Sequence, residues 1–296
     1  MKHVFFIILM QVNLALANNI SVIIPFSPGG ATDQIWRVIH PRLSQDHGII
    51  TVTEYHPGAG GGLGAAAAAR RKSPALVFTS ASLVLAPLVN PGLDVDLEQW
   101  RLLAHAGDYV LVLLSGTRGP NSWNQLRSQC RSRALQYGNS GLGSMTHISV
   151  LALFREIGCA AEPIPYKSSG LSLPDLAGGN IDLVMDHPTG TVLGLIGQGR
   201  ITPLLITGQS RLPMLPTTPT SRELGLSMNL RNWHVLVANT AVSNDQAQRI
   251  TDAMRMVLSD SRVQQELRLL GVESSGQLLP RDFLLQQRQK LSAVLP

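Results

Sequence analysis

The sequence predicts an α/β protein of two lobes, each a mostly parallel sheet flanked by helices. Short apolar runs alternate with amphipathic stretches across Gly-, Ser- or Pro-containing turns, which is typical of repeated strand–turn–helix units. The alternation starts again after Ser115-Gly116-Thr117, a segment with the composition of a hinge. About 280 residues follow the N-terminal leader, and that length suits two hydrophobic cores better than one.

The N-terminus has the pattern of a cleaved secretory signal. Lys2 precedes an apolar run over residues 4–10, and the small-x-small motif that signal peptidase cleaves follows at 15–17. We therefore expect a signal peptide at 1–17, a mature chain that begins near Asn18, and a periplasmic location. No Cys follows the apolar run, which argues against a lipid anchor. No later apolar run approaches the ~20 residues that cross a bilayer, so the mature protein is expected to be soluble.

The charge balance excludes one class of partner. The formal net charge of +5 falls to +4 without Lys2, which suits a small anionic ligand. The basic residues are scattered with few aromatics among them, whereas nucleic-acid-binding proteins cluster both. We expect a monomer that binds no nucleic acid.

The chain has two cysteines, Cys130 and Cys159. An oxidising compartment permits a disulfide between them, and two free buried thiols are the alternative. Their spacing is not that of a metal site, and no metal is predicted.

The first half of the chain reads as strands with helices between them. The buried run Ser21–Phe26 is the first strand, and the helix after it carries Ile35, Ile39 and Leu43 on one face. We expect Thr32 to cap this helix and Pro41 to kink it. The next predicted elements are a strand at 49–55, a helix at 65–70, and strands at 75–79 and 108–114.

The second half repeats this order. The predicted elements are a helix at 122–132, a strand at 134–137, a helix at 145–157 capped by Ser144, a strand at 163–166, a helical turn at 172–177, and strands at 181–185, 201–207 and 233–238. Two amphipathic helices, near 244–258 and 280–294, end the chain. The last strand and helices have no sheet of their own, so we assign residues 18–113 and 231–296 to lobe one and 114–230 to lobe two.

Two turns of the same build stand out as candidate binding loops. Residues 27–33 (SPGGATD) and 137–147 (YGNSGLGSMTH) each lie between a strand and a helix N-terminus. Glycines let backbone N–H groups point into open space, hydroxyls add donors, and the helix dipole adds partial positive charge, which together favour an anion. Turn and cap chemistry alone explains one such loop. Two equivalent loops, one in each half, point to a carboxylate clamp.

Several fragments resemble one protein family in the order in which that family carries them. They are IPFSPGGATD (24–33), EYHPGAGGGLGAAAAAR (54–70), YGNSGLGSMTH (137–147), PIPYKSSG (163–170), LPDLAGGNIDLVMD (173–186) and LPTTPTSRELGL (215–226). The chain resembles the periplasmic receptors of tripartite tricarboxylate transporters, often called Bug-type solute-binding proteins. The resemblance implies a type II periplasmic-binding-protein-like fold with a ligand cleft between the lobes. It also implies capture of a small carboxylate for integral membrane transporter subunits, with no cofactor.

The resemblance assigns candidate ligand-binding residues to several loops. On the two loops and the strand ends they are Gly29, Gly30, Thr32, Asp33, Thr79, Ser82, Ser140, Gly143, Ser144, His147, Tyr166, Lys167 and Asp186. Four of them have a structural alternative. Asp33 complements the helix dipole in a first turn, His147 is a partner for loop carbonyls, Lys167 is a solvated cation, and Asp186 braces a neighbouring loop.

The sequence departs from the family pattern at three places near the cleft. Tyr55-His56 stands where the family carries Asn-Arg, Lys72-Ser73-Pro74 is shorter than the usual segment, and Ser168 replaces a Gly after the Tyr-Lys pair. These changes leave the ligand open among di- and tricarboxylates, acidic amino acids and aromatic acids.

Two other classes of protein are weighed against a transport receptor. Gly60-x-Gly62-x-x-Ala65 fits a dinucleotide-binding fingerprint, but after Glu54 the next acidic residue is Asp94, too far along to hold a ribose. No nucleophile motif with a paired base is present, so we predict that the protein is not an enzyme. A receptor for a signalling partner would use the same fold, and the sequence leaves that alternative open.

Overall fold

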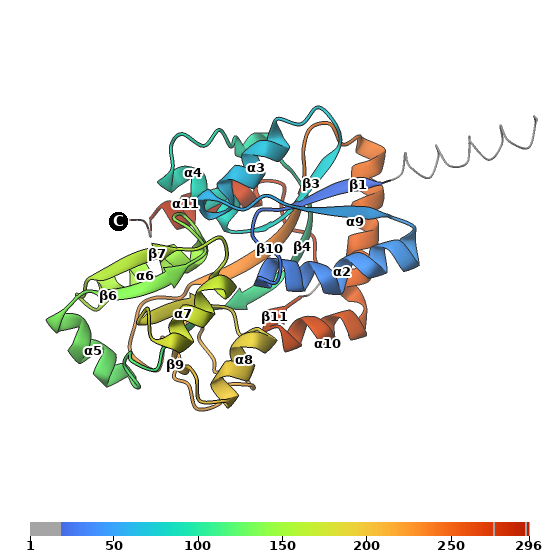
Figure 1. Cartoon of the computed structure of the whole chain (residues 1–296). Helices are drawn as coiled ribbons and strands as arrows, with labels where there is room; N and C mark the ends of the chain where they lie inside the picture. The colour runs from blue at the N-terminus through green and yellow to red at the C-terminus, as the bar shows by residue number, and fades with distance from the viewer. Residues whose placement is uncertain (1–18, 275, 294, 296) are drawn as a thin grey trace, which may run out of the picture.

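The structure is a computed structural model that describes residues 19–274, 276–293 and 295. The predicted signal peptide at 1–17 lies outside these residues. Two separate β-sheets, each with helices against it, form the two lobes of the molecule (Figure 1). In the part of the chain that is described, no helix is both long and apolar enough to cross a membrane.

The first sheet has six strands in the order β11-β4-β10-β3-β1-β2. Their bounds are Ile20–Ile24 (β1), Thr51–Tyr55 (β2), Ala75–Ser80 (β3), Arg101–Val110 (β4), Arg231–Ala238 (β10) and Val272–Glu273 (β11). Strand β10 lies between β4 and β3, so the chain returns to the first sheet at this strand.

The second sheet has five strands in the order β7-β6-β8-β5-β9. Their bounds are Val112–Ser115 (β5), Leu135–Asn139 (β6), Ala161–Pro165 (β7), Leu183–Asp186 (β8) and Thr202–Ile206 (β9). Only Leu111 separates β5 from β4, but β5 belongs to this second sheet.

Both sheets are mixed, and the prediction that they are mostly parallel was wrong. In the first sheet β1 runs parallel to β2 and β3, while β10 and β11 run antiparallel to β4. In the second sheet β6 runs parallel to β7 and β8, while β5 runs antiparallel to β8 and β9. The antiparallel pairs lie where the chain passes between the lobes. The connection between sheets imposes their direction, and the repeated strand–helix pattern carries no information about it.

The chain crosses from the first sheet to the second at Leu111, between β4 and β5. Thr207 ties this crossing to the return path. Its N–H donates to the Leu111 carbonyl and its hydroxyl accepts from the Leu111 N–H, both at 2.9 Å. The same hydroxyl donates to the Leu230 carbonyl at 2.8 Å. The boundary expected at residue 113 falls inside β5, because the continuous apolar run DYVLVLL does not show which sheet each residue joins.

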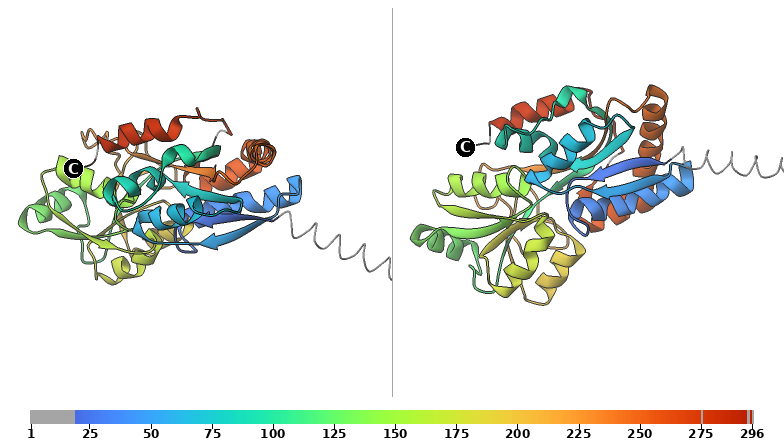
Figure 2. Two further views of the ribbon diagram at one scale, coloured as in Figure 1. Left: turned by 90° about the horizontal axis from the view of Figure 1, so that it is seen from above. Right: turned by 45° about the horizontal axis from the view of Figure 1, so that its top comes forward.

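Helices cover the faces of both sheets. Their bounds are Ala31–His47 (α2), Gly62–Ala69 (α3), Ser82–Val89 (α4), Trp123–Ser132 (α5), Met145–Glu156 (α6), Leu173–Gly178 (α7), Gly190–Gly197 (α8), Asn244–Ser259 (α9), Ser261–Leu269 (α10) and Phe283–Ser292 (α11), with 3₁₀ turns at Ala59–Gly61 (η1), Leu97–Gln99 (η2) and Ser169–Ser172 (η3). The C-terminal helix α11 packs along α4 of the first lobe (Figure 2).

Three helices were absent from the sequence prediction. Helix α4 (SLVLAPLV) and helix α8 (GTVLGLIG) are short and apolar on all sides, so no period distinguishes them from buried strands or loops. Helix α10 follows α9 after Asp260, whose carboxylate accepts from two first-turn N–H groups. That cap starts a second helix at 261–269, where no element was predicted.

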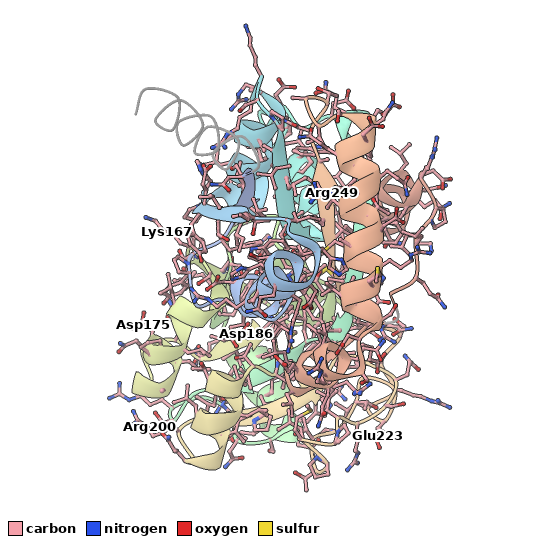
Figure 3. The ribbon with its side chains drawn as sticks, turned by 90° about the vertical axis from the view of Figure 1, so that its right-hand side faces the viewer. Lys167, Asp175, Asp186, Arg200, Glu223 and Arg249 are labelled. Atoms are coloured by element: carbon pink, nitrogen blue, oxygen red, sulfur yellow. A yellow bond between two sulfur atoms is a disulfide. The ribbon has the colours of Figure 1, made fainter. Side chains whose placement is uncertain are left out.

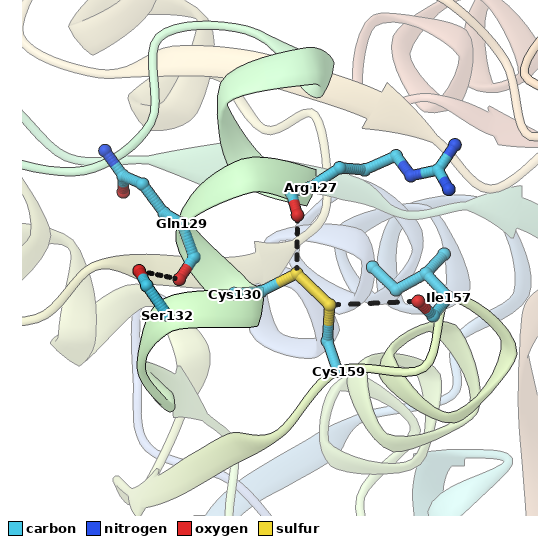
Figure 4. Close-up of a disulfide and its surroundings, with 6 residues drawn as sticks. All are labelled: Arg127, Gln129, Cys130, Ser132, Ile157 and Cys159. Carbon is cyan, nitrogen blue, oxygen red and sulfur yellow. Dashed lines mark hydrogen bonds between the residues drawn. A yellow bond between two sulfur atoms is a disulfide. The ribbon is translucent and has the colours of Figure 1, made fainter.

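A disulfide joins Cys130 in the last turn of α5 to Cys159 just after α6 (Figure 4). The two Cα atoms are 5.5 Å apart. Cys130 is 4% exposed and follows Leu126 by one helical turn, so both face the interior of the second lobe. The bridge pins α5 to the α6–β7 connection and therefore supports the helix that begins at the second candidate loop.

Candidate functional site

The two candidate loops meet in space at one small chamber between the sheets. The first turn of α2 contributes Ala31 and Thr32 to its wall, and the first turn of α6 contributes Met145 and Thr146. First-turn N–H groups have no acceptor within their own helix, and they carry the positive end of the helix dipole. Two helix N-termini directed at one space are suited to hold an anion.

Hydroxyl groups dominate the rest of this inner chamber, whose volume is about 20 Å³. Its lining residues are Phe26, Gly30, Ala31, Thr32, Ser80, Ser82, Tyr109, Ser140, Ser144, Met145, Thr146, Ser168, Ser169, His187 and Asn232. None of these described residues is Lys or Arg. A carboxylate there would be held by N–H and O–H dipoles.

A larger outer chamber of about 190 Å³ adjoins the inner one. The two share Gly30, Ala31 and Ser168 in their walls. The outer chamber is otherwise lined by Pro28, Gly29, Gln34, Gly170, Leu171, Leu173, Asp186, Thr189 and Thr191. The pair of chambers can therefore take an elongated molecule whose polar end points inward.

The lobes contact each other around this site. Gly141 of lobe two lies against Gly60 of lobe one so closely that an added Cβ would come within 2.8 Å of the Gly60 nitrogen. The Ser27 N–H donates to the Lys167 carbonyl at 3.3 Å, and the Asn90 side chain donates to the Leu142 carbonyl at 3.4 Å. The chambers are thus enclosed by backbone from both lobes.

Asp33 braces the first loop and lines neither chamber. Its carboxylate accepts from the Gly29 N–H at 2.8 Å, from Arg37 Nε at 2.9 Å and from the Tyr55 hydroxyl at 2.8 Å. Burial raises the pKa of Asp33, but these hydrogen bonds and the Arg37 charge outweigh it and hold that pKa below its usual value. Tyr55, one of the departures from the family pattern, thus fixes the glycine turn of this loop.

Thr32 is the second residue of α2 rather than its cap. The N-cap is Gly30, and it has no side chain to bond the first turn. Instead the Thr32 hydroxyl pairs with His234 Nε2 at 2.9 Å. Burial first, then the neighbouring His187 and His105, hold the pKa of His234 well below its usual value, so its ring stays neutral. His234 fixes the Thr32 hydroxyl at the chamber wall.

A hydroxyl network holds the second loop. The Thr146 hydroxyl accepts from the Ser140 N–H at 3.0 Å and donates to the Ser140 hydroxyl at 3.1 Å. Ser144 caps α6 as predicted, because its hydroxyl accepts from the His147 N–H at 3.2 Å. His147 lies outside both chambers and its Nδ1 accepts from the Gly143 N–H at 3.3 Å. The structural alternative for His147 therefore agrees with its contacts.

We expect His147→Asn to reduce the dependence of the protein's stability on pH between pH 6.5 and 4. Burial lowers the pKa of His147 from 6.5 to about 4. Between these pH values the His147 imidazole is therefore protonated in the unfolded chain but neutral in the folded chain. Stability is fully present above pH 6.5 and falls as the pH drops toward 4, by an amount on the order of 3 kcal/mol. The Asn side-chain oxygen can still accept from Gly143 but does not titrate in this range.

The measurement is urea denaturation of both proteins at several pH values. His47→Asn is the matched control, since His47 ends α2 away from the chambers. If the free energy of unfolding of His147→Asn falls with pH as steeply as that of the wild type, His147 does not cause the pH dependence.

The residues predicted at the strand ends of lobe two have divergent roles. Lys167 is exposed at the edge of the molecule, and Asp186 lies further inside (Figure 3). The Tyr166 hydroxyl donates to Asp175 Oδ2 at 2.7 Å, outside both chambers. Asp186 is 3% exposed and accepts from the Ser169 hydroxyl at 2.5 Å and from its neighbour's N–H at 2.8 Å. Asp186 thus touches the outer chamber while bracing its wall.

The structure brings together seven of the thirteen predicted residues at the chambers: Gly29, Gly30, Thr32, Ser82, Ser140, Ser144 and Asp186. It places the other six outside them: Asp33, Thr79, Gly143, His147, Tyr166 and Lys167. Thr79 was one residue out of register, because side chains alternate along β3 and Ser80 reaches the chamber instead.

Sequence reasoning missed several lining residues. Ser168 was noted only as a departure from the family pattern, yet it contacts both chambers. Tyr109, His187 and Asn232 carried no local signal at all. Tyr109 lies in the predicted strand at 108–114, Asn232 directly precedes the predicted strand at 233–238, and the two become neighbours because β4 pairs with β10. In the described residues no cluster of side chains suits a metal ion.

Comparison with known proteins gives one consistent result. Residues 35–279 match the family model described as tripartite tricarboxylate transporter family receptor. The chain is 31% identical over 217 residues to Protein BugT of Bordetella pertussis, an alignment that covers 71% of this chain and 66% of that protein.

Solved structures agree with that match. A periplasmic transporter structure is 26% identical with a TM-score of 0.85, and the match covers 93% of this chain and 94% of that chain. A Rhodopseudomonas palustris protein solved with adipate is 26% identical with a TM-score of 0.84, and the match covers 93% of this chain and 95% of that chain. The periplasmic binding protein BugD, at 24% identity and a TM-score of 0.85, shares the fold.

Proposed function

This chain belongs to the tripartite tricarboxylate transporter family of receptors, and on that premise we propose that it captures a small carboxylate between its lobes and presents it to membrane subunits of a transporter. The family consists of solute-binding receptors, so the protein is not an enzyme. The observation that carries the ligand class is the inner chamber, where α2 and α6 aim their N-termini at one space. A similar protein was solved with adipate, which supports a carboxylate ligand.

The chemistry of the chamber explains how an uncharged site would bind an anion. Carboxylate oxygens accept hydrogen bonds from N–H and O–H groups, and bonds to an ionised acceptor are about twice as strong as neutral ones. The chamber offers hydroxyls from both lobes, among them Thr32, Ser140 and Ser144. Because donors come from both lobes, the carboxylate would favour the closed arrangement.

We also propose that the protein is exported to the periplasm. The pattern at residues 1–17 supports cleavage before Asn18 and a periplasmic location, as in the periplasmic relatives. N-terminal sequencing of the protein recovered from the periplasm tests this part, and an intact Met1 would contradict it.

A thermal-shift screen of carboxylic acids tests the ligand class. A bound acid at a hundred times its Kd should stabilise the folded protein by roughly 2.7 kcal/mol, or several degrees in melting temperature. The methyl ester of the same acid should give no shift, because the N–H and O–H donors would lose their charged acceptor. An ester that stabilises as well as its acid would refute the carboxylate clamp.

Two substitutions locate the site within that screen. Thr32→Val and Ser144→Ala should each weaken binding by about 1–3 kcal/mol, the usual range for a hydrogen bond to a charged group. Thr217→Val is the control, since Thr217 is exposed and lines neither chamber. Equal affinities in all three variants, measured by titration calorimetry, would place the ligand elsewhere.

A further inference from the structure

Two buried polar atoms at the wall of the inner chamber have no hydrogen-bond partner among the described residues. They are the Tyr109 hydroxyl and His187 Nε2. Tyr109 is 1% exposed and His187 is 8% exposed, and both line the chamber. A buried polar group without a partner is energetically costly, so two at one site point to a ligand group that pairs with them.

The fold brings these two residues together from different lobes. Tyr109 lies near the end of β4 in the first sheet, two residues before the crossing at Leu111. His187 directly follows β8 in the second sheet. Their ring centroids are 4.4 Å apart at an interplanar angle of 54°. The pair therefore forms only when the lobes are close, as a ligand-dependent contact requires.

The neighbours of His187 determine which of its nitrogens carries the proton. His187 Nδ1 lies 3.0 Å from Asp186 Oδ1, and an ionised carboxylate can only accept. The Nδ1 atom therefore holds a proton, and when the imidazole carries only that proton Nε2 is an acceptor. The Ser169 hydroxyl also donates to Asp186 Oδ1, at 2.5 Å, which keeps the carboxylate in place behind the imidazole.

Tyr109 supplies the complementary donor. Burial first, then the charges of Asp186 and Asp108, hold its pKa well above the usual value, so the phenol keeps its proton. The ring is fixed by His234, which stacks on it with centroids 5.0 Å apart and an interplanar angle of 26°. The chamber wall thus presents one donor, from Tyr109, beside one acceptor, from His187.

A donor next to an acceptor matches a hydroxyl group, which both accepts and donates. A carboxylate oxygen only accepts and would leave His187 Nε2 unpaired. An ammonium group only donates and would leave the Tyr109 proton unpaired. We propose that Tyr109 and His187 recognise a hydroxyl on the bound carboxylate, so that the ligand is a hydroxycarboxylate. This inference rests on the proposed carboxylate receptor function and specifies its ligand class.

Titration calorimetry with matched acids tests the inference. The probes are malate against succinate and lactate against propionate, pairs that differ by one hydroxyl, with aspartate and alanine as the amino counterparts. We expect the hydroxylated member of the pair that binds to bind at least about tenfold more tightly, since a site built to bond a hydroxyl rejects the analogue without it. The amino counterpart should bind more weakly than the hydroxy acid.

Two variants assign the preference to the two residues. Tyr109→Phe removes the donor, and His187→Asn keeps a group near Asp186 but removes the Nε2 acceptor. Each should lower the affinity for the hydroxy acid much more than the affinity for the deoxy acid, so that the hydroxy-to-deoxy affinity ratio falls close to one. If either residue has a purely structural role, its variant should weaken the binding of both acids alike. Tyr166→Phe is the control, because the Tyr166 hydroxyl bonds Asp175 outside both chambers.

The outcomes separate this inference from the receptor function. If the acids bind with equal affinity, or the amino acid binds most tightly, recognition of a hydroxyl is refuted and the receptor function stands. A preference that survives both variants would assign it to other residues and also refute the inference. If no carboxylic acid binds at all, the proposed function itself fails, and the ligand class falls with it.

Discussion

Gly60→Ala is expected to weaken ligand binding by about 100-fold or more and to hold the two lobes apart. Gly60 has a φ of +62°, a conformation that costs an L-residue roughly 1–2 kcal/mol. An added Cβ would also lie 2.4 Å from the Leu142 carbonyl oxygen and 2.7 Å from the Ser144 nitrogen. Both are backbone atoms of the second loop, so no side chain can rotate away. Only a separation of the lobes relieves the overlap.

The size of the effect follows from the population of the closed form. If the closed form is disfavoured until only about one molecule in a hundred adopts it, the apparent affinity falls by the same factor. Calorimetry with the acid that stabilises the wild-type protein measures the loss of affinity. Small-angle scattering without ligand gives an independent readout, because separated lobes raise the radius of gyration.

Gly199→Ala is the matched control for backbone strain. Gly199 has a φ of +66°, close to that of Gly60, but a Cβ there would meet nothing within 4 Å. We expect Gly199→Ala to lose some stability and to bind as the wild type does. Equal binding by Gly60→Ala and wild type would show that contact between Gly60 and the second loop is not needed for binding.

Removal of the disulfide should cost about 3–4 kcal/mol of stability in the Cys130→Ala, Cys159→Ala double variant. The bridge spans a sequence separation of 29 residues, and in the chain-entropy model a closed loop of that length constrains the unfolded chain by that amount. The loss should lie in the second lobe, where the bridge fastens α5 to the end of α6. Urea denaturation without reductant measures it.

Reductant supplies the control for this prediction. The wild-type protein should lose about the same stability with dithiothreitol, and the double variant should not respond to it. Peptide mapping of the unreduced protein should recover the fragment with Cys130 linked to Cys159. Complete labelling of both thiols in the unfolded, unreduced protein would contradict the bridge.

Local signals predicted the elements that carry the site. The strand, glycine turn and helix at residues 20–47 and again at 135–156 form as expected, because turns and caps depend on residues a few positions apart. Ser144 is the clearest case, since its hydroxyl accepts from the N–H three residues later. The first loop needed more than local chemistry, since Gly30 takes the cap position expected for Thr32 and frees the Thr32 hydroxyl for His234.

Local signals did not predict the directions of the strands or the residues of the chamber wall. Tyr109 begins the apolar run 109–114, in which every position is buried, so alternation does not reveal which side chain reaches a cavity. His187 follows a short buried strand and has a structural neighbour, Asp186, that explains its presence without a ligand. Both become site residues only through contact between the lobes.

The sequence by itself determined the family, the two glycine–hydroxyl loops and the helix N-termini behind them, because these features arise from interactions a few residues apart. The tertiary structure alone decided what those loops face. Thr32 meets His234 across 202 positions, and Tyr109 meets His187 across the two lobes. Such contacts depend on how the sheets pair and how the chain crosses at Leu111, and no short segment encodes that geometry. The sequence therefore specified the two loops that we propose hold the carboxylate, and the packing of the lobes specified the wall that we propose recognises the rest of the ligand.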